Sequence, residues 1–340
     1  MARSVQSLPK AHLHLHFTGS MRPATLVALA DKHGLRLPDV LTRSWPPTLS
    51  ATDERGWFRF QRLYDTARAC VRDESDMRRI VQEAAQDDAA EGSRWLEIQV
   101  DPTSYAPFVG GITPALEIVL DEARSVSRES GTDVAVVVAA NRIRHPLDAR
   151  MLARLAARHA GDGPGQVVGF GLSNDERRGT TAEFGPAFDI ARRAGLACVP
   201  HGGELLGADA VGETMTALGP DRLGHGIRSA EDPRVLAEVV RRGITLEVCP
   251  GSNVALGVYK AAQDVPLRQL MEAGAQIALG ADDPLLFGSR LNAQYDTART
   301  VHGLSDVELA ELARGSVRGS RAPATAQSRI LADIDRWLAG

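Results

Sequence analysis

Three histidines stand within five residues of one another near the start of the chain. His12, His14 and His16 alternate with apolar residues in the stretch AHLHLHFTGS. Residues two apart in a β-strand point to the same face, so we expect these side chains to form a ladder. A buried imidazole needs a partner for each nitrogen, and a cation is the simplest partner for three stacked rings. The stretch therefore predicts a metal site, although one functional and two structural histidines would also fit it.

Three later stretches carry similar side chains, each at the end of an apolar run. They are His201-Gly-Gly-Glu204, His225 between two glycines, and Asp282-Asp283-Pro284. The C-terminal ends of the strands of a barrel meet at one edge, where barrel enzymes build their sites. Three imidazoles, one carboxylate and a water suit zinc, which lowers the pKa of bound water toward about 7 and supplies hydroxide. The pattern predicts a hydrolytic reaction.

Eight short β-rich runs would position these residues, and nearly all of them end in polar or small side chains. From the second run onward their ends lie about 25 to 40 residues apart, the length of one strand, one helix and two short loops. Amphipathic helical patterns lie between them. This order predicts an α/β fold, a (β/α)8 TIM barrel. The runs are 11–20, 95–104, 133–142, 167–176, 197–204, 222–227, 244–253 and 276–284, and the clearest helical patterns are 112–130, 149–160 and 233–243.

The segment 21–94 is too long for a single connection between two strands. It predicts several helices, including 23–34 and 76–92, with the proline-bearing segment 38–54 between them. Such an insertion could form a lid over the mouth of the barrel or cover its flank. Residues 291–340 predict further helices at the C-terminus. Because no repeat or linker divides the chain, we expect residues 1–340 to form one domain.

The composition excludes several other classes of protein. The 340 residues include 39 basic and 43 acidic side chains, with a formal net charge of −4, which gives no electrostatic case for binding nucleic acid or an anionic membrane. Cys70, Cys198 and Cys249 are odd in number and far apart, so neither a disulfide framework nor a thiolate metal cluster is expected. With no signal-peptide pattern and no apolar run of about 20 residues, we expect a cytoplasmic protein.

Five motifs resemble those of the adenosine deaminase family, part of the amidohydrolase superfamily. PKAHLHLHFTGS, HGGE, LGHGI, VCPGSN and ADDPLLF occur in the order and spacing of that family, from residue 8 to about 290. The resemblance implies one zinc ion per chain, with a substrate contact from His16 as well. The implied zinc ligands are His14, His16, His201 and Asp282. His12 stands where the family has a glutamate or another residue, so we expect it in the core or behind the ligands.

The same resemblance implies roles for the other site residues. Glu204 would protonate N1 of an adenine while hydroxide attacks C6 and ammonia leaves. His225 and Asp282 would orient the attacking water and stabilise its charge. Asp283, biased toward an extended conformation by the following proline, would bind purine N7. Asn174 stands where the family usually has a glycine whose backbone N–H meets N3.

Thr18 is the more informative departure from the family. Adenosine deaminases usually have an aspartate here that receives the ribose 5′-hydroxyl, and adenine deaminases commonly have a glutamate. A hydroxyl would tolerate an acidic 5′ group that a carboxylate would repel. Four arginines could bind such an acid or could be ordinary surface residues. They are Arg142, Arg144, Arg177 and Arg178.

The favoured function is zinc-dependent deamination of a purine nucleoside, a small molecule. FTGS together with LSNDERRG resembles the branch that deaminates 6-aminodeoxyfutalosine, a precursor of menaquinone with an acidic 5′ group. Adenosine or deoxyadenosine is the alternative substrate, followed by free adenine, and a non-catalytic nucleoside-binding barrel is a further alternative. A cytidine-type zinc deaminase needs an HxE and PCxxC pair, but Cys249-Pro250 lacks the second cysteine.

Overall fold

Eight parallel strands form the centre of the molecule in a computed structural model that describes residues 2–340. They pair in sequence order from β1 to β8. The barrel closes where the backbone N–H of His16 donates to the Asp282 carbonyl at 3.0 Å and the N–H of Asp282 donates to the His14 carbonyl at 2.9 Å. The predicted (β/α)8 barrel is confirmed. The strands are β1 Lys10–His16, β2 Ser93–Val100, β3 Asp133–Asn141, β4 Val167–Ser173, β5 Ala197–Gly202, β6 Arg222–His225, β7 Thr245–Val248 and β8 Ile277–Leu279.

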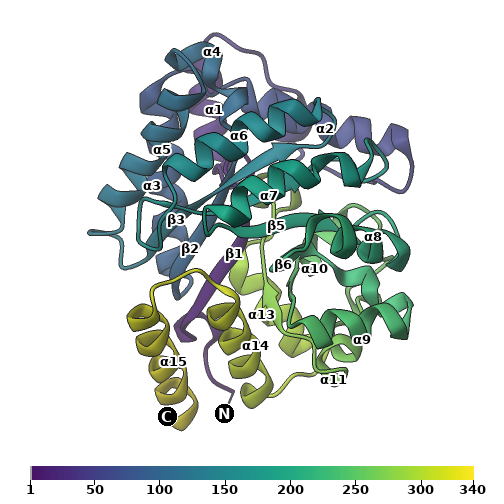
Figure 1. The fold of residues 1–340 in the computed structure, drawn as a ribbon. Coiled ribbons are helices and arrows are strands. Elements are labelled where there is room, and N and C mark those ends of the chain that lie inside the picture. The colour runs from purple at the N-terminus through teal and green to yellow at the C-terminus, as the bar shows by residue number, and fades with distance from the viewer. Residues whose placement is uncertain (1) are drawn as a thin grey trace.

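Helices surround the strands, and the two termini lie close together below the barrel in Figure 1. The amphipathic patterns form helices because one face packs on the strands while the other meets solvent. The helices are α1 Pro23–Lys32, α2 Glu54–Arg68, α3 Glu74–Ala90, α4 Ala106–Val109, α5 Ile112–Val126, α6 Pro146–Arg158, α7 Gly185–Arg193, α8 Ala208–Leu218, α9 Pro233–Arg242, α10 Pro250–Ala255, α11 Leu267–Glu272, α12 Pro284–Phe287, α13 Leu291–Thr300, α14 Asp306–Gly319 and α15 Ala324–Ala339.

The inserted segment 21–94 forms α1, α2 and α3, and these helices have different positions. A capping box at Asp73 starts α3, which packs against β2 and α5 on the flank of the barrel. The side chain of Asp53 caps α2 by accepting from the N–H of Gly56. Trp57 and Phe60 of α2 line the cavity at the mouth of the barrel. The insertion therefore covers both the flank and the mouth.

An irregularity in β1 separates His12 from the other two histidines of its stretch. His12 lies beside Leu96 of β2, whereas Leu15 lies beside Ile98, so three residue steps on β1 match two on β2. Leu96 and Ile98 pack outward against the helices. An extra residue in a strand shifts the side chains before it to the opposite face of the sheet. The expected ladder of three histidines is therefore wrong for His12, which faces outward.

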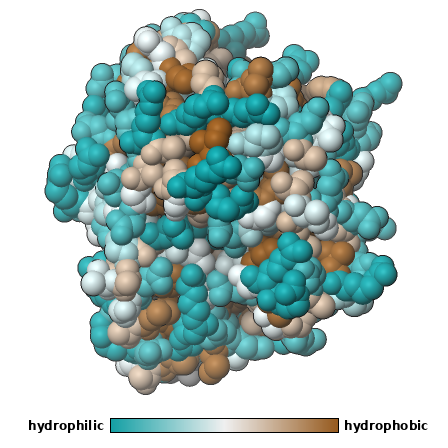
Figure 2. Space-filling model, viewed as in Figure 1, coloured by the Kyte–Doolittle hydropathy of each residue, from teal (hydrophilic) through white to brown (hydrophobic). Residues whose placement is uncertain are grey.

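The surface shown in Figure 2 has only small hydrophobic patches, separated by hydrophilic residues. No helix within residues 2–340 combines the length and the apolar character needed to cross a membrane. Cys70, Cys198 and Cys249 are all buried and unpaired.

Candidate active site

Four of the predicted ligands converge at the C-terminal ends of the strands. The imidazole centroids of His14 and His201 lie 4.9 Å apart, and those of His16 and His201 lie 5.3 Å apart. Asp282 follows β8, and its Oδ1 lies 3.4 Å from His16 Nε2 and 3.8 Å from His14 Nε2. Gly224 makes this approach possible, because a Cβ there would lie 2.6 Å from the His201 ring. His14, His16 and His201 are close enough to share one metal ion.

The chemistry of this cluster fits a divalent cation. Nε2 of His14 and Nε2 of His201 are buried without a hydrogen-bond partner among residues 2–340. Burial lowers the pKa of His16 to about 4 and that of His201 well below its usual range, so both imidazoles are neutral. Burial opposes ionisation of Asp282, but the pKa of this carboxyl is lowered, because its Oδ1 lies 3.8 Å from Nε2 of His14, an imidazole whose own pKa is raised. Neutral imidazoles and an ionised carboxylate are the forms that bind zinc.

Three buried charged side chains inside the barrel, linked by hydrogen bonds, support His14. The Nδ1–H of His14 donates to Glu247 Oε2 at 2.8 Å, which leaves Nε2 free to point into the cluster. Glu247 also accepts from Arg222 Nε at 2.6 Å, and Arg222 reaches Glu97 through its other nitrogen. All three charged residues are fully buried in the barrel. The analysis of the sequence missed them, although a glutamate inside each of the apolar runs WLEIQV and ITLEV was a usable signal.

Glu204 and His225 lie beside the cluster. Burial, followed by the charges of Asp282 and Glu176, raises the pKa of Glu204 well above its usual range. These surroundings favour the protonated form of the side chain. His225 Nε2 lies 3.6 Å from Glu204 Oε2 and 3.9 Å from Asp282 Oδ2, and burial lowers the pKa of His225 to about 3. Glu204 can therefore donate a proton, and the neutral imidazole of His225 beside it can accept a hydrogen bond.

The backbone is strained at three of the predicted site residues. Asn174, His225 and Asp282 have φ angles of 84°, 64° and 62°. Residues other than glycine seldom adopt this left-handed conformation, and it concentrates at functional sites. Each of them follows or ends a strand at the mouth of the barrel. The strain therefore belongs to the turns that present these residues to the cavity.

Asp283 lies in the same cavity as the histidines. Its Oδ1 is buried without a hydrogen-bond partner in the described part of the chain. Burial, with the charges of Asp282 and Glu204, raises the pKa of Asp283 well above its usual range. A Cβ at Gly19 would lie 1.7 Å from this oxygen, so only glycine leaves room for it. Asp283 therefore offers a buried, protonated acid to a ligand.

The cavity extends beyond the histidines to a second end. About 730 Å³ of space lies between its walls, part of it open to solvent. Thr18 lines it and shares a hydrogen bond of 2.5 Å with the hydroxyl of Tyr105. Most residues of this end were not expected from the sequence, because they come from α2, from β2 and from the turn that follows β2. They are Trp57, Phe60, Tyr64, Arg68, Gln99, Asp101 and Tyr105.

The four candidate arginines do not line this cavity. Arg142 is buried and donates from Nη2 to the carbonyl of His201 at 3.1 Å. Arg177 binds Asp175, its neighbour two residues back. Arg144 and Arg178 line an adjoining cavity, and a contact of 3.5 Å joins Arg178 to an exposed glutamate of α2.

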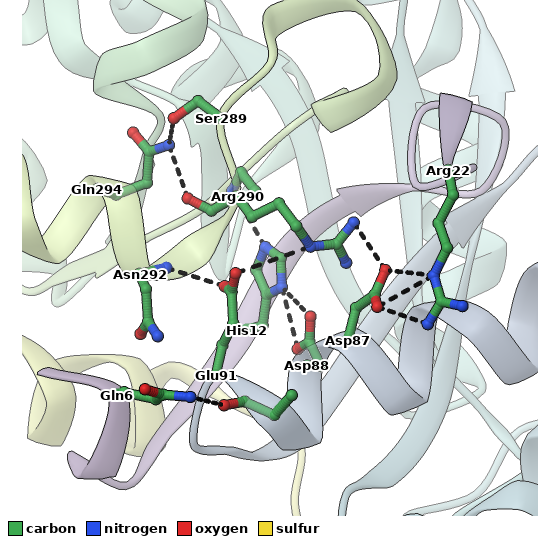
Figure 3. A network of polar contacts seen from close by, with 12 residues as sticks. Gln6, His12, Arg22, Asp87, Asp88, Glu91, Ser289, Arg290, Asn292 and Gln294 are labelled. Atoms are coloured by element: carbon green, nitrogen blue, oxygen red, sulfur yellow. Dashed lines mark hydrogen bonds and ion pairs between the residues drawn. The ribbon is translucent and has the colours of Figure 1, made fainter. Parts of the chain in front are cut away.

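His12 supports the site from outside the barrel. Its Nδ1 lies 3.0 Å from Asp88 Oδ1 of α3, and its Nε2 lies 3.0 Å from the backbone nitrogen of Ala281 (Figure 3). With the Nδ1–H donated to Asp88, Nε2 accepts the N–H of Ala281, the residue before Asp282. The same network contains the pair between Arg290 and Asp87. His12 thus joins α3 to the end of β8.

Comparisons with known proteins place this geometry in a family. The model of the adenosine deaminase family matches residues 9–337. A Streptomyces virginiae protein, provisionally named adenosine/adenine deaminase, is 63% identical over 100% of this chain and 99% of its own. Aminodeoxyfutalosine deaminase of Streptomyces avermitilis is 31% identical over 98% of this chain and 92% of its own. The crystal structure of adenine deaminase from Arthrobacter aurescens matches with a TM-score of 0.89 at 27% identity, covering 98% of this chain and 99% of that one.

Proposed function

The chain belongs to the adenosine deaminase family, hydrolytic deaminases of the amidohydrolase superfamily, and we propose that it uses zinc to remove the 6-amino group of an adenine-containing nucleoside. One observation carries this proposal. The buried Nε2 atoms of His14 and His201 lack hydrogen-bond partners within residues 2–340, and His201 lines the same cavity as Glu204, whose pKa is raised well above its usual range. A protein that only binds a nucleoside has no need of a proton donor beside a metal site.

His14, His16, His201 and Asp282 would hold the zinc ion. When bound, zinc lowers the pKa of water toward about 7 and supplies hydroxide at neutral pH. Attack at C6 pushes electrons onto N1 of the purine. Glu204 donates its proton to N1 and so prevents negative charge from building up on the ring.

The remaining residues orient the two reactants. His225, neutral because it is buried, accepts a hydrogen bond from the attacking water, and Asp282 shares this role through its Oδ2. Asp283, protonated for the same reason, donates to N7, which has only a lone pair to offer. The backbone N–H of Asn174 would meet N3. The proton of the attacking hydroxyl would then pass through Asp282 to the amino nitrogen, the C6–N bond breaks as the C6–O double bond forms, and ammonia leaves.

For the substrate, we favour an adenine nucleoside with an acidic 5′ group, such as 6-aminodeoxyfutalosine. Support comes from Thr18, whose hydroxyl faces Tyr105 where a carboxylate would repel an acid. The relative named aminodeoxyfutalosine deaminase is consistent with this choice. Adenosine and free adenine are the second candidates, because the 63% identical relative and the solved neighbour carry those names.

Ammonia release from the zinc-loaded protein tests the function. We expect about one zinc per chain and turnover of 6-aminodeoxyfutalosine with a higher kcat/KM than adenosine or adenine. Glu204→Gln should keep zinc and substrate binding but lower kcat by roughly 10²–10⁴, because the amide cannot donate the proton. Turnover of none of the three compounds would refute the deaminase proposal, and a preference for adenosine or adenine would refute the choice of substrate.

A further inference from the structure

Gln99 is a buried side chain whose two polar atoms lack partners. It is 2% exposed, and neither its Nε2 nor its Oε1 has a hydrogen-bond partner within residues 2–340. It lies on β2 beside His16 and lines the cavity. Burying an amide without partners costs free energy, and native proteins rarely do so without a reason. A ligand that both donates and accepts hydrogen bonds would satisfy it.

Asp101, two residues further along the chain, shows the same property. Thr103 holds its Oδ1 through the backbone N–H at 3.0 Å and through the hydroxyl at 2.6 Å. Its Oδ2 is buried without a partner in the described part of the chain. The free oxygen lies in the same cavity wall and can accept from a hydroxyl.

Arg68 of α2 brings a positive charge to this end of the cavity. Its Nη1 donates to Ser104 Oγ at 3.2 Å, and its Nη2 contacts Asp65, a half-exposed residue of the same helix. A guanidinium has five N–H groups, so these contacts leave donors for a ligand. Because solvent screens Asp65, this ion pair is a weak competitor for an anion. Burial raises the pKa of Asp101, which reduces its repulsion of the same anion.

We propose that Gln99, Asp101 and Arg68 form a subsite for the sugar and the 5′ end of the substrate. Gln99 and Asp101 bind sugar hydroxyls, and Arg68 binds a carboxylate or phosphate on the 5′ side. This inference rests on the proposed deaminase function and assigns a charge partner that none of the four arginines predicted from the sequence provides. Free adenine would leave the amide of Gln99 without partners.

Arg68→Gln tests the charge. We expect kcat/KM of the wild type to be higher for adenosine 5′-carboxylate or adenosine 5′-phosphate than for adenosine, and the better of the two acids identifies the anion. Arg68→Gln should lower kcat/KM for that acid roughly 10- to 100-fold more than for adenosine, and Arg68→Lys should restore part of the loss. Arg62→Gln is the matched control, because Arg62 is an exposed arginine of the same helix outside this cavity.

Gln99→Leu tests the sugar contact independently. It keeps the volume but removes both polar atoms, so it should lower kcat/KM for adenosine at least about 10-fold more than for free adenine. The subsite would be overturned if Gln99→Leu lowered kcat/KM equally for adenosine and adenine, or if Arg68→Gln lowered it equally for the acid and adenosine. A wild type that prefers adenosine to both acids would also overturn it. All of these outcomes are measured as ammonia released by an active enzyme. A wild type that deaminates neither these compounds nor 6-aminodeoxyfutalosine would refute the proposed function instead.

Discussion

Glu204 differs from an ordinary surface glutamate in the protonation state that its surroundings favour. Burial and neighbouring carboxylates raise its pKa well above the usual range. Because donation to N1 needs the protonated form, kcat should be at its full value below this raised pKa and fall as the pH rises through it. A pH profile of kcat for the zinc-loaded enzyme measures this limb. The residual activity of Glu204→Gln should lack it, and an unchanged limb in that variant would assign the titration to another group.

Glu247 allows a second test at the scale of single residues. Its Oε2 fixes the tautomer of His14, so Glu247→Gln should weaken zinc binding about 10- to 100-fold. Glu97→Gln is the control, because it removes a similar negative charge from Arg222 without touching His14. Competition with a chelator of known affinity, performed on folded protein, gives both dissociation constants. Equal weakening in the two variants would show that the charge on Arg222 matters and the contact with His14 does not.

The connection between α3, β1 and β8 depends on the pair of His12 and Asp88. His12→Leu leaves the Asp88 carboxylate buried without this donor and should lower the free energy of unfolding by about 2–4 kcal/mol. The double variant with Asp88→Leu should lose less than the sum of the single losses, because it removes both polar groups together. Denaturant unfolding of the zinc-free proteins measures all three values. Additive losses would contradict the coupling.

The strands were predictable from the sequence because short apolar runs that end in polar or small residues recur at the spacing of one strand and one helix. The irregularity of β1 was not, since the alternation of histidines with apolar residues contains no sign of the extra residue. Arg68 and Gln99 were missed for a different reason: only the folded chain brings α2 over the end of β2. The candidate arginines were selected because they lie near strand ends in the sequence. In the folded chain a local contact can occupy such a side chain, as Asp175 does for Arg177. That residues 1–340 form one domain stays a prediction.

For the whole molecule, the site joins strands that are distant in sequence. The implied zinc ligands come from β1, from β5 and from the segment that follows β8, so bound zinc should resist opening of the barrel. Free zinc at about 1,000 times its dissociation constant should stabilise the fold by about 4 kcal/mol. Thermal unfolding with and without a chelator measures the shift. Glu204→Gln should show the same shift, and His14→Ala/His16→Ala should show almost none, while an equal shift in that variant would place the stabilising zinc elsewhere.

The closure of the barrel between β1 and β8 also determines when the site can form during synthesis. His14 and His16 leave the ribosome more than 260 residues before Asp282. At about 5–20 residues per second, roughly tens of seconds pass between these events. During that interval the nascent chain presents two histidines without their carboxylate partner and an unpaired edge on β1. Metal capture at the full site is therefore a late event, one that follows translation of the last strand.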